Sequence, residues 1–140
     1  MKKISRKTMI IGLVAVILVA AGIIFVVSSK VNDPIAFTKQ AQITEYPGKP
    51  INKTFKKYLG GNVKEEWRSK EMETGDSHPG YDVVVIYEKD DMHMEVRFVV
   101  SLYYEFAKPY KVYIRDTSYG EIHTSYQDEK LDQILDEIFG

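Results

Sequence analysis

The 140-residue chain contains no cysteine, and this absence excludes several kinds of chemistry. Disulfide bonds, thiolate metal sites and lipid attachment to a cysteine all require a thiol. A phosphate-binding glycine loop is also missing, because no Lys-Ser/Thr pair follows Gly60 and Gly61. No Gly-x-Ser-x-Gly motif is present to place a serine nucleophile on a sharp turn. The sequence therefore predicts no cofactor and no covalent catalysis.

Histidine is scarce as well. His78, His93 and His123 are far apart, and none has a second histidine at the i+3 or i+4 spacing of a zinc-binding helix. His93 and His123 could approach each other across a sheet, but we interpret all three as ordinary surface residues. The sequence therefore predicts no metal site.

The chain does contain one long apolar run, residues 9–27, with no charge and no proline. As a helix this run would rise about 28 Å, close to the roughly 30 Å hydrocarbon core of a bilayer. Four cations precede the run, at Lys2, Lys3, Arg6 and Lys7. The positive-inside rule then predicts a cytoplasmic basic flank over residues 1–8 and a transmembrane helix, acting as a signal anchor, over residues 9–27. Membrane lipid is the expected partner of that helix.

A cleaved signal peptide is the alternative reading of the same run. The apolar core of a signal peptide is usually 7–15 residues long and ends in a small-x-small cleavage site. Residues 9–27 exceed that length, although Val27, Ser28 and Ser29 could serve as a weak cleavage site. The length favours a retained anchor, and thus a single-pass protein of the cell membrane with its C-terminal domain outside.

The part of the chain after the run is mildly acidic. It carries 15 of the 19 basic residues and all 20 acidic residues, a net charge of −5. A nucleic-acid partner is not expected, because phosphate contacts need a basic face. We expect a tether over residues 28–44, which is polar and contains Pro34, and one small domain over residues 45–140.

The hydrophobic pattern of this domain predicts an α+β fold. A helix is expected after Pro50, with Ile51, Phe55 and Tyr58 on one face and with Gly60-Gly61 ending it. Four strands follow, over residues 63–73, 81–88, 92–104 and 110–115, with a break at residues 107–109. Alternation is clearest in residues 92–104. A second amphipathic helix ends the chain, with Ser125 and Asp128 as its capping box. Short connections favour a four-stranded antiparallel sheet, flanked in the chain by an N-terminal and a C-terminal helix whose apolar stripes pack on one face of the sheet.

The domain resembles a group of small extracytoplasmic α+β domains of Gram-positive bacteria. The resemblance is carried by turn and hydrophobic residues: Tyr46-Pro47-Gly48-Lys49-Pro50-Ile51, Phe55, Tyr58, Trp67, Val83-Val84-Val85, residues 96–100, Leu135 and Ile138-Phe139. It implies this fold behind a membrane segment. It carries over no catalytic residue, because the function of these domains is uncharacterised.

Tyrosines are concentrated in the β half of the domain, and tyrosine and arginine are common at protein interfaces. Tyr103 shares strand parity with Arg97, and Tyr113 with Arg115. If their faces coincide, these four residues form a protein-binding face. Plain sheet packing is the alternative explanation of the tyrosines.

An acidic loop over residues 71–80 is the rival site. Glu71, Glu73, Asp76 and His78 could hold a cation or support an extracytoplasmic enzyme, but their spacing matches no known calcium loop. We therefore expect a solvated loop. The favoured function is a non-catalytic, membrane-anchored module that binds another envelope or membrane protein. An enzyme or metal-binding domain, and a structural subunit of a membrane complex, are the alternatives.

Overall fold

The computed structural model describes residues 33–140, and residues 34–140 form one compact unit. The predicted basic flank, the predicted transmembrane helix over residues 9–27 and the first residues of the predicted tether lie outside the described residues. Within residues 33–140, no helix is long and apolar enough to cross a membrane.

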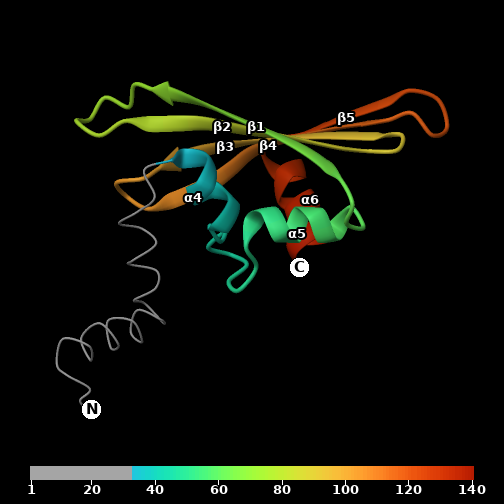
Figure 1. The fold of residues 1–140 in the computed structure, drawn as a ribbon, viewed down its shortest axis with the longest axis horizontal. Helices are drawn as coiled ribbons and strands as arrows, with labels where there is room; N and C mark the ends of the chain where they lie inside the picture. The colour runs from blue at the N-terminus through green and yellow to red at the C-terminus, as the bar shows by residue number, and fades with distance from the viewer. Residues whose placement is uncertain (1–32) are drawn as a thin grey trace, which may run out of the picture. The chain divides into compact units, whose positions relative to one another are not determined.

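The domain is an α+β fold built on a five-stranded antiparallel sheet in the order β1-β2-β3-β4-β5. The strands are β1 (Lys64–Met72), β2 (Gly80–Lys89), β3 (Met92–Ser101), β4 (Phe106–Asp116) and β5 (Ile122–Tyr126). The described helices are α4 (Pro34–Gln40), α5 (Ile51–Tyr58) and α6 (Glu129–Phe139). All three lie against the same face of the sheet, and no described helix covers the opposite face (Figure 1).

The core lies between the sheet and these helices. Alternate residues of β3, from Met94 to Val100, are fully buried, as the period of two in the sequence predicts. Phe55 of α5 occupies the centre of the core. Its ring packs edge-on against Phe98 of β3 and Phe139 of α6, with centroid distances of 6.5 and 5.2 Å. The apolar stripes of α5 and α6 therefore meet over β3.

The predicted tether is wrong from Pro34 onward, because residues 34–40 form helix α4. Proline suits the first turn of a helix, where its missing N–H needs no partner. Thr38 is fully buried and donates a 2.7 Å hydrogen bond to the carbonyl of Pro34. Ile43 is also buried in the core. Because these side chains dock on the sheet, the domain begins at Pro34 and not at Glu45.

The prediction of four strands is also wrong, because β5 pairs with β4. Tyr113 lies opposite Ser125, so Ser125 belongs to a strand and not to a helix cap. Helix α6 begins after Asp128, which has a positive φ of 56° and makes no side-chain capping hydrogen bond. Strand β5 is only five residues long, and its three central residues, His123, Thr124 and Ser125, are all polar, so the sequence shows no alternation there.

The predicted break at residues 107–109 is absent, since β4 runs through Pro109. The register shifts there: Arg97 lies opposite Lys111, whereas Phe98 lies opposite Pro109. Tyr110 is therefore a bulge residue. Strand β5 pairs with β4 only from Val112 onward, so Pro109 has no strand on its second side and its missing N–H is tolerated. The bulge turns Tyr110 and Lys111 to the same face of the sheet, away from the helices.

Candidate functional site

The uncovered face of the sheet, here called the open face, carries three of the four predicted binding residues. Arg97 lies opposite Lys111, and Glu95 lies opposite Tyr113. Arg115 lies between His93 of β3 and His123 of β5. Parity on β3 and β4 therefore places Arg97, Tyr113 and Arg115 on one face, as the sequence predicts.

Tyr103 does not belong to the open face. Strand β3 ends at Ser101, whose hydroxyl accepts a 2.9 Å hydrogen bond from the backbone N–H of Tyr104. Residues 102–105 form a turn in which Glu105 has a positive φ of 56°, so the alternation of the strand stops before Tyr103. The ring of Tyr103 is 60% exposed and stacks on His78, with a centroid distance of 3.4 Å.

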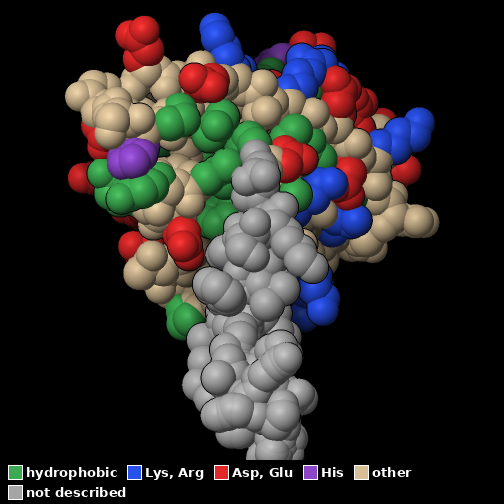
Figure 2. Space-filling view, turned by 60° about the vertical axis from the view of Figure 1, so that its left-hand side comes forward, with side chains coloured by type: hydrophobic (Ala, Val, Ile, Leu, Met, Phe, Trp, Pro, Cys, Tyr) green, Lys and Arg blue, Asp and Glu red, His purple; other side chains and the backbone are tan. Residues whose placement is uncertain are grey.

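The turn at residues 102–105 and the acidic loop thus meet at one end of the sheet. Tyr104 packs edge-on against Tyr103, with a centroid distance of 4.9 Å. Figure 2 shows hydrophobic side chains and a histidine gathered at this end of the domain. Tyr103 therefore lies beside the loop over residues 71–80, which the sequence offers as the alternative site, and not beside the other three predicted binding residues.

The acidic loop is organised by its own hydrogen bonds. The Asp76 carboxylate accepts 2.7 Å from the backbone N–H of His78 and 2.9 Å from the hydroxyl of Tyr104. These two hydrogen bonds, the His78 bond first, lower the pKa of Asp76. Within residues 33–140, no three histidine or carboxylate side chains converge on a position that could hold a metal ion. Glu71, Glu73 and Asp76 therefore form no ligand set.

Tyr110 was not predicted as a site residue, and its contacts organise one half of the open face. Its hydroxyl donates a 2.8 Å hydrogen bond to Asp82 on β2, across the intervening strand β3. Burial first, and then this carboxylate, raise the pKa of the Tyr110 hydroxyl. Arg97 lies 3.4 Å from the other Asp82 oxygen and 2.9 Å from Glu95. Asp82 thus holds a tyrosine and an arginine together.

Tyr113 reaches in the opposite direction. Its hydroxyl is hydrogen-bonded to Nδ1 of His123 on β5, and Nε2 of His123 lies 2.7 Å from the Glu121 carboxylate. His93 packs edge-on against the Tyr113 ring, at 6.4 Å. A carboxylate, an imidazole and a phenol in this order could move a proton. However, the His123 side chain is 46% exposed, so water competes for the same bonds. The contacts support a role in holding the Tyr113 ring in place.

Strand β4 presents two tyrosines interleaved with three cations on the open face. This β4 stripe consists of Lys108, Tyr110, Lys111, Tyr113 and Arg115. None of its three cations takes part in an ion pair within residues 33–140. The expected break at Pro109 concealed the stripe in the sequence, because without the bulge Tyr110 would face the helices.

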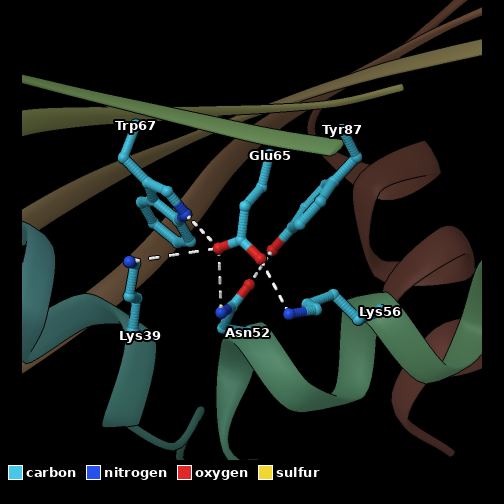
Figure 3. Close-up of polar contacts among 6 residues, drawn as sticks. All are labelled: Lys39, Asn52, Lys56, Glu65, Trp67 and Tyr87. Carbon is cyan, nitrogen blue, oxygen red and sulfur yellow. Dashed lines mark hydrogen bonds and ion pairs between the residues drawn. The ribbon is translucent and has the colours of Figure 1, made fainter. Parts of the chain in front are cut away.

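A second polar cluster, also missed in the sequence, lies on the helix side of the sheet. The Glu65 carboxylate of β1 accepts hydrogen bonds from Trp67 at 2.8 Å, Lys56 at 2.8 Å and Asn52 at 3.2 Å (Figure 3). Burial alone would raise the pKa of Glu65, but these hydrogen bonds lower it. Because Asn52 and Lys56 belong to α5, their bonds to Glu65 join the edge strand β1 to that helix.

The signal for this cluster in the sequence is weak. Glu65 and Trp67 are two residues apart, so they share one face of a strand. Asn52 also accepts a 2.8 Å hydrogen bond from the buried Tyr87 hydroxyl, a contact that no spacing predicts. The helix residues that complete the cluster, Asn52 and Lys56, are recognisable only once α5 is placed against β1.

Comparison with known proteins finds no family model, no curated protein and no solved structure that matches this chain.

Proposed function

We propose that this chain is a membrane-anchored extracytoplasmic module that binds its ligand on the open face, without catalysis. The observation that carries the proposal is the one-sided packing of the sheet. Three helices cover one face, while the other presents Arg97, Tyr113 and Arg115. Tyrosine and arginine dominate the binding energy of many interfaces. A face that packs against nothing else in the domain is free to use them.

The hydrogen bonds of this face also favour binding. Tyr110 and Tyr113 are each tied to a residue of another strand, so their rings lose little conformational freedom on contact with a ligand. Ordering a free side chain at an interface costs roughly 0.5–1.5 kcal/mol. Two tyrosines that are already ordered avoid much of that penalty. The open face is therefore prepared for binding before a ligand arrives.

The membrane anchor in this proposal rests on residues 9–27 and the basic flank before them. Because the domain begins at Pro34, only residues 28–33 separate it from that run. Six residues span at most about 20 Å when extended. A retained anchor would thus keep the domain close to the membrane, within reach of envelope components. The resemblance to Gram-positive extracytoplasmic domains agrees with this location.

The alternative site in the acidic loop has less support. An enzyme or a metal-binding domain would need the carboxylates of residues 71–80 to be available to a ligand. Both oxygens of Asp76 are already used, one by His78 and the other by Tyr104. A structural subunit that uses residues 9–27 for assembly is compatible with the open face but does not explain it.

The proposal is tested with a photo-crosslinking amino acid placed in the full-length chain, in the cells that produce it. Position Val99 lies on the open face, whereas Asp132 lies exposed on α6, on the other side of the domain. We expect adducts from Val99 and none from Asp132. Adducts from Asp132 alone, or no adduct from Val99, would contradict a binding role of the open face.

A further inference from the structure

The charge of the β4 stripe opposes the charge of the domain. Five of the 19 basic residues and none of the 20 acidic residues precede Asp33, so residues 33–140 carry 14 basic against 20 acidic residues. An acidic domain repels anions over most of its surface. On β4, however, Lys108, Lys111 and Arg115 all point to the open face. A cationic stripe on such a domain selects where an anion can bind.

The residues that pair with these cations across the sheet carry no carboxylate. Lys108 lies opposite Val99, and Lys111 lies opposite Arg97. Arg115 has a histidine on each side, His93 and His123. The carboxylates of Asp82 and Glu95 are held by Arg97, and those of Glu88 and Glu121 lie beside His93 and His123. No cross-strand partner of the three stripe cations is therefore acidic, and an anionic ligand would complete this part of the face.

The tyrosines of the stripe define the rest of the ligand. Tyr110 reaches across β3 to β2, and Tyr113 reaches to β5, so both side chains run along the sheet and not away from it. Tyr110 is 37% exposed and Tyr113 is half-buried, so each ring keeps part of its apolar surface open to a ligand. The C–H face of a sugar ring stacks on such a surface, while carboxylates pair with lysine and arginine.

We propose that the β4 stripe binds an extended acidic polysaccharide, with sugar rings stacked on Tyr110 and Tyr113 and carboxylates paired with Lys108, Lys111 and Arg115. This inference rests on the proposed function, since it names the ligand class of the open face. An acidic peptide fits less well. From Val112 to Asp116 the backbone of β4 is paired on both sides, so a peptide could add as a strand only beside residues 106–111 and would leave Tyr113 and Arg115 unused.

The test uses the full-length chain in uncharged detergent micelles and measures affinity by calorimetry. The probe is polygalacturonate, which carries a carboxylate on every sugar. Dextran supplies sugar rings without charge, and polyglutamate supplies carboxylates without sugar rings. We expect polygalacturonate to bind at least tenfold more tightly than either control, with an affinity that falls as salt rises.

Two variants and a matched control locate the site. The double variant Lys111→Gln/Arg115→Gln removes charge, and Tyr110→Leu removes a stacking ring; each should weaken binding at least tenfold. Lys130→Gln removes an exposed charge on α6 and should leave affinity unchanged. The circular dichroism spectrum and thermal unfolding of each variant establish that it is folded.

Each other result overturns the ligand class. Equal binding of polyglutamate would show that the sugar ring is not recognised. If Lys130→Gln lowers the affinity for polygalacturonate as much as the stripe variants do, the polymer responds only to the net charge of the domain. If none of the three polymers binds, the stripe is not a site for an anionic polymer. None of these results contradicts the binding role of the open face, because crosslinking from Val99 tests that role without assuming a ligand.

Discussion

The hydroxyl of Tyr110 on β4 donates a 2.8 Å hydrogen bond to Asp82 on β2, across the full width of β3. This contact exists because a bulge next to Pro109 turns Tyr110 to the open face. The same carboxylate also holds Arg97. One irregularity in β4 therefore joins three neighbouring strands through Tyr110 of β4, Arg97 of β3 and Asp82 of β2.

The first prediction concerns this bond. Tyr110→Phe keeps the ring and removes the hydroxyl, so unfolding should require about 0.5–1.5 kcal/mol less free energy. Denaturant unfolding of the full-length chain in micelles measures the change. Tyr119→Phe is the matched control, because Tyr119 is 94% exposed and none of its contacts within residues 33–140 is a hydrogen bond. Equal effects of the two substitutions would mean that the bond to Asp82 adds no stability.

The second prediction compares two neighbours on β3. Phe98 is fully buried between Trp67 and Phe55, so Phe98→Ala should lower the free energy of unfolding by roughly 3–5 kcal/mol. Val99 lies on the open face, and Val99→Ala should change it by no more than about 0.5 kcal/mol. Fluorescence of Trp67, the only tryptophan, reports the transition. A larger loss of stability in Val99→Ala than in Phe98→Ala would mean that the helices pack on the face that carries Val99.

The third prediction concerns pH. The pKa of Glu65 is lower in the folded domain than in the unfolded chain, because its hydrogen bonds to Lys56, Trp67 and Asn52 outweigh the effect of burial. In acid the unfolded chain therefore binds more protons, and stability falls as pH drops through the folded pKa. Glu65→Gln should destabilise the domain near neutral pH and flatten this acid dependence.

The control for Glu65 is the adjacent residue on the opposite face. Glu66 pairs with Arg68, and both side chains are more than half exposed. Exposed pairs contribute about 0–1 kcal/mol, so Glu66→Gln should leave the acid dependence in place. Denaturant unfolding between pH 3 and 7 compares the two variants. If Glu65→Gln keeps the full acid dependence, the cluster around Glu65 does not control it.

Strong periodicity made much of the fold predictable. Residues 92–101 alternate without interruption, and the apolar stripes of α5 and α6 recur at helical spacing. The missed elements are short. Helix α4 makes two turns, and β5 pairs with only one strand. Over so few residues a period cannot be distinguished from chance, and burial against the rest of the domain decides the structure.

The candidate site was predictable only where a strand is regular. Parity correctly placed Arg97, Tyr113 and Arg115 on one face, because each lies on the continuous part of β3 or β4. It failed for Tyr103, which follows the end of β3, and it missed Tyr110, whose orientation depends on the bulge. Turns and bulges are set by pairing with neighbouring strands, and pairing is not visible in local sequence.

The fourth prediction concerns the anchor. If residues 9–27 form a retained transmembrane helix, the full-length chain should stay with the membrane after alkaline and high-salt washing, with its domain accessible to protease from outside. Immunoblotting of the fractions measures the distribution. A soluble chain that begins near Lys30 would instead indicate a cleaved signal peptide.

The most direct test of the open face compares two substitutions in the chain that carries the crosslinker at Val99. Tyr103 stacks on His78 at the end of the sheet, and we expect Tyr103→Ala to leave the yield of adduct unchanged. Tyr113→Ala/Arg115→Ala alters the open face and should reduce the yield at least tenfold, while the circular dichroism spectrum shows that the variant is folded. Loss of the adduct in Tyr103→Ala, with full yield in the double variant, would mean that the open face is not the binding site and would place the site in the loop over residues 71–80.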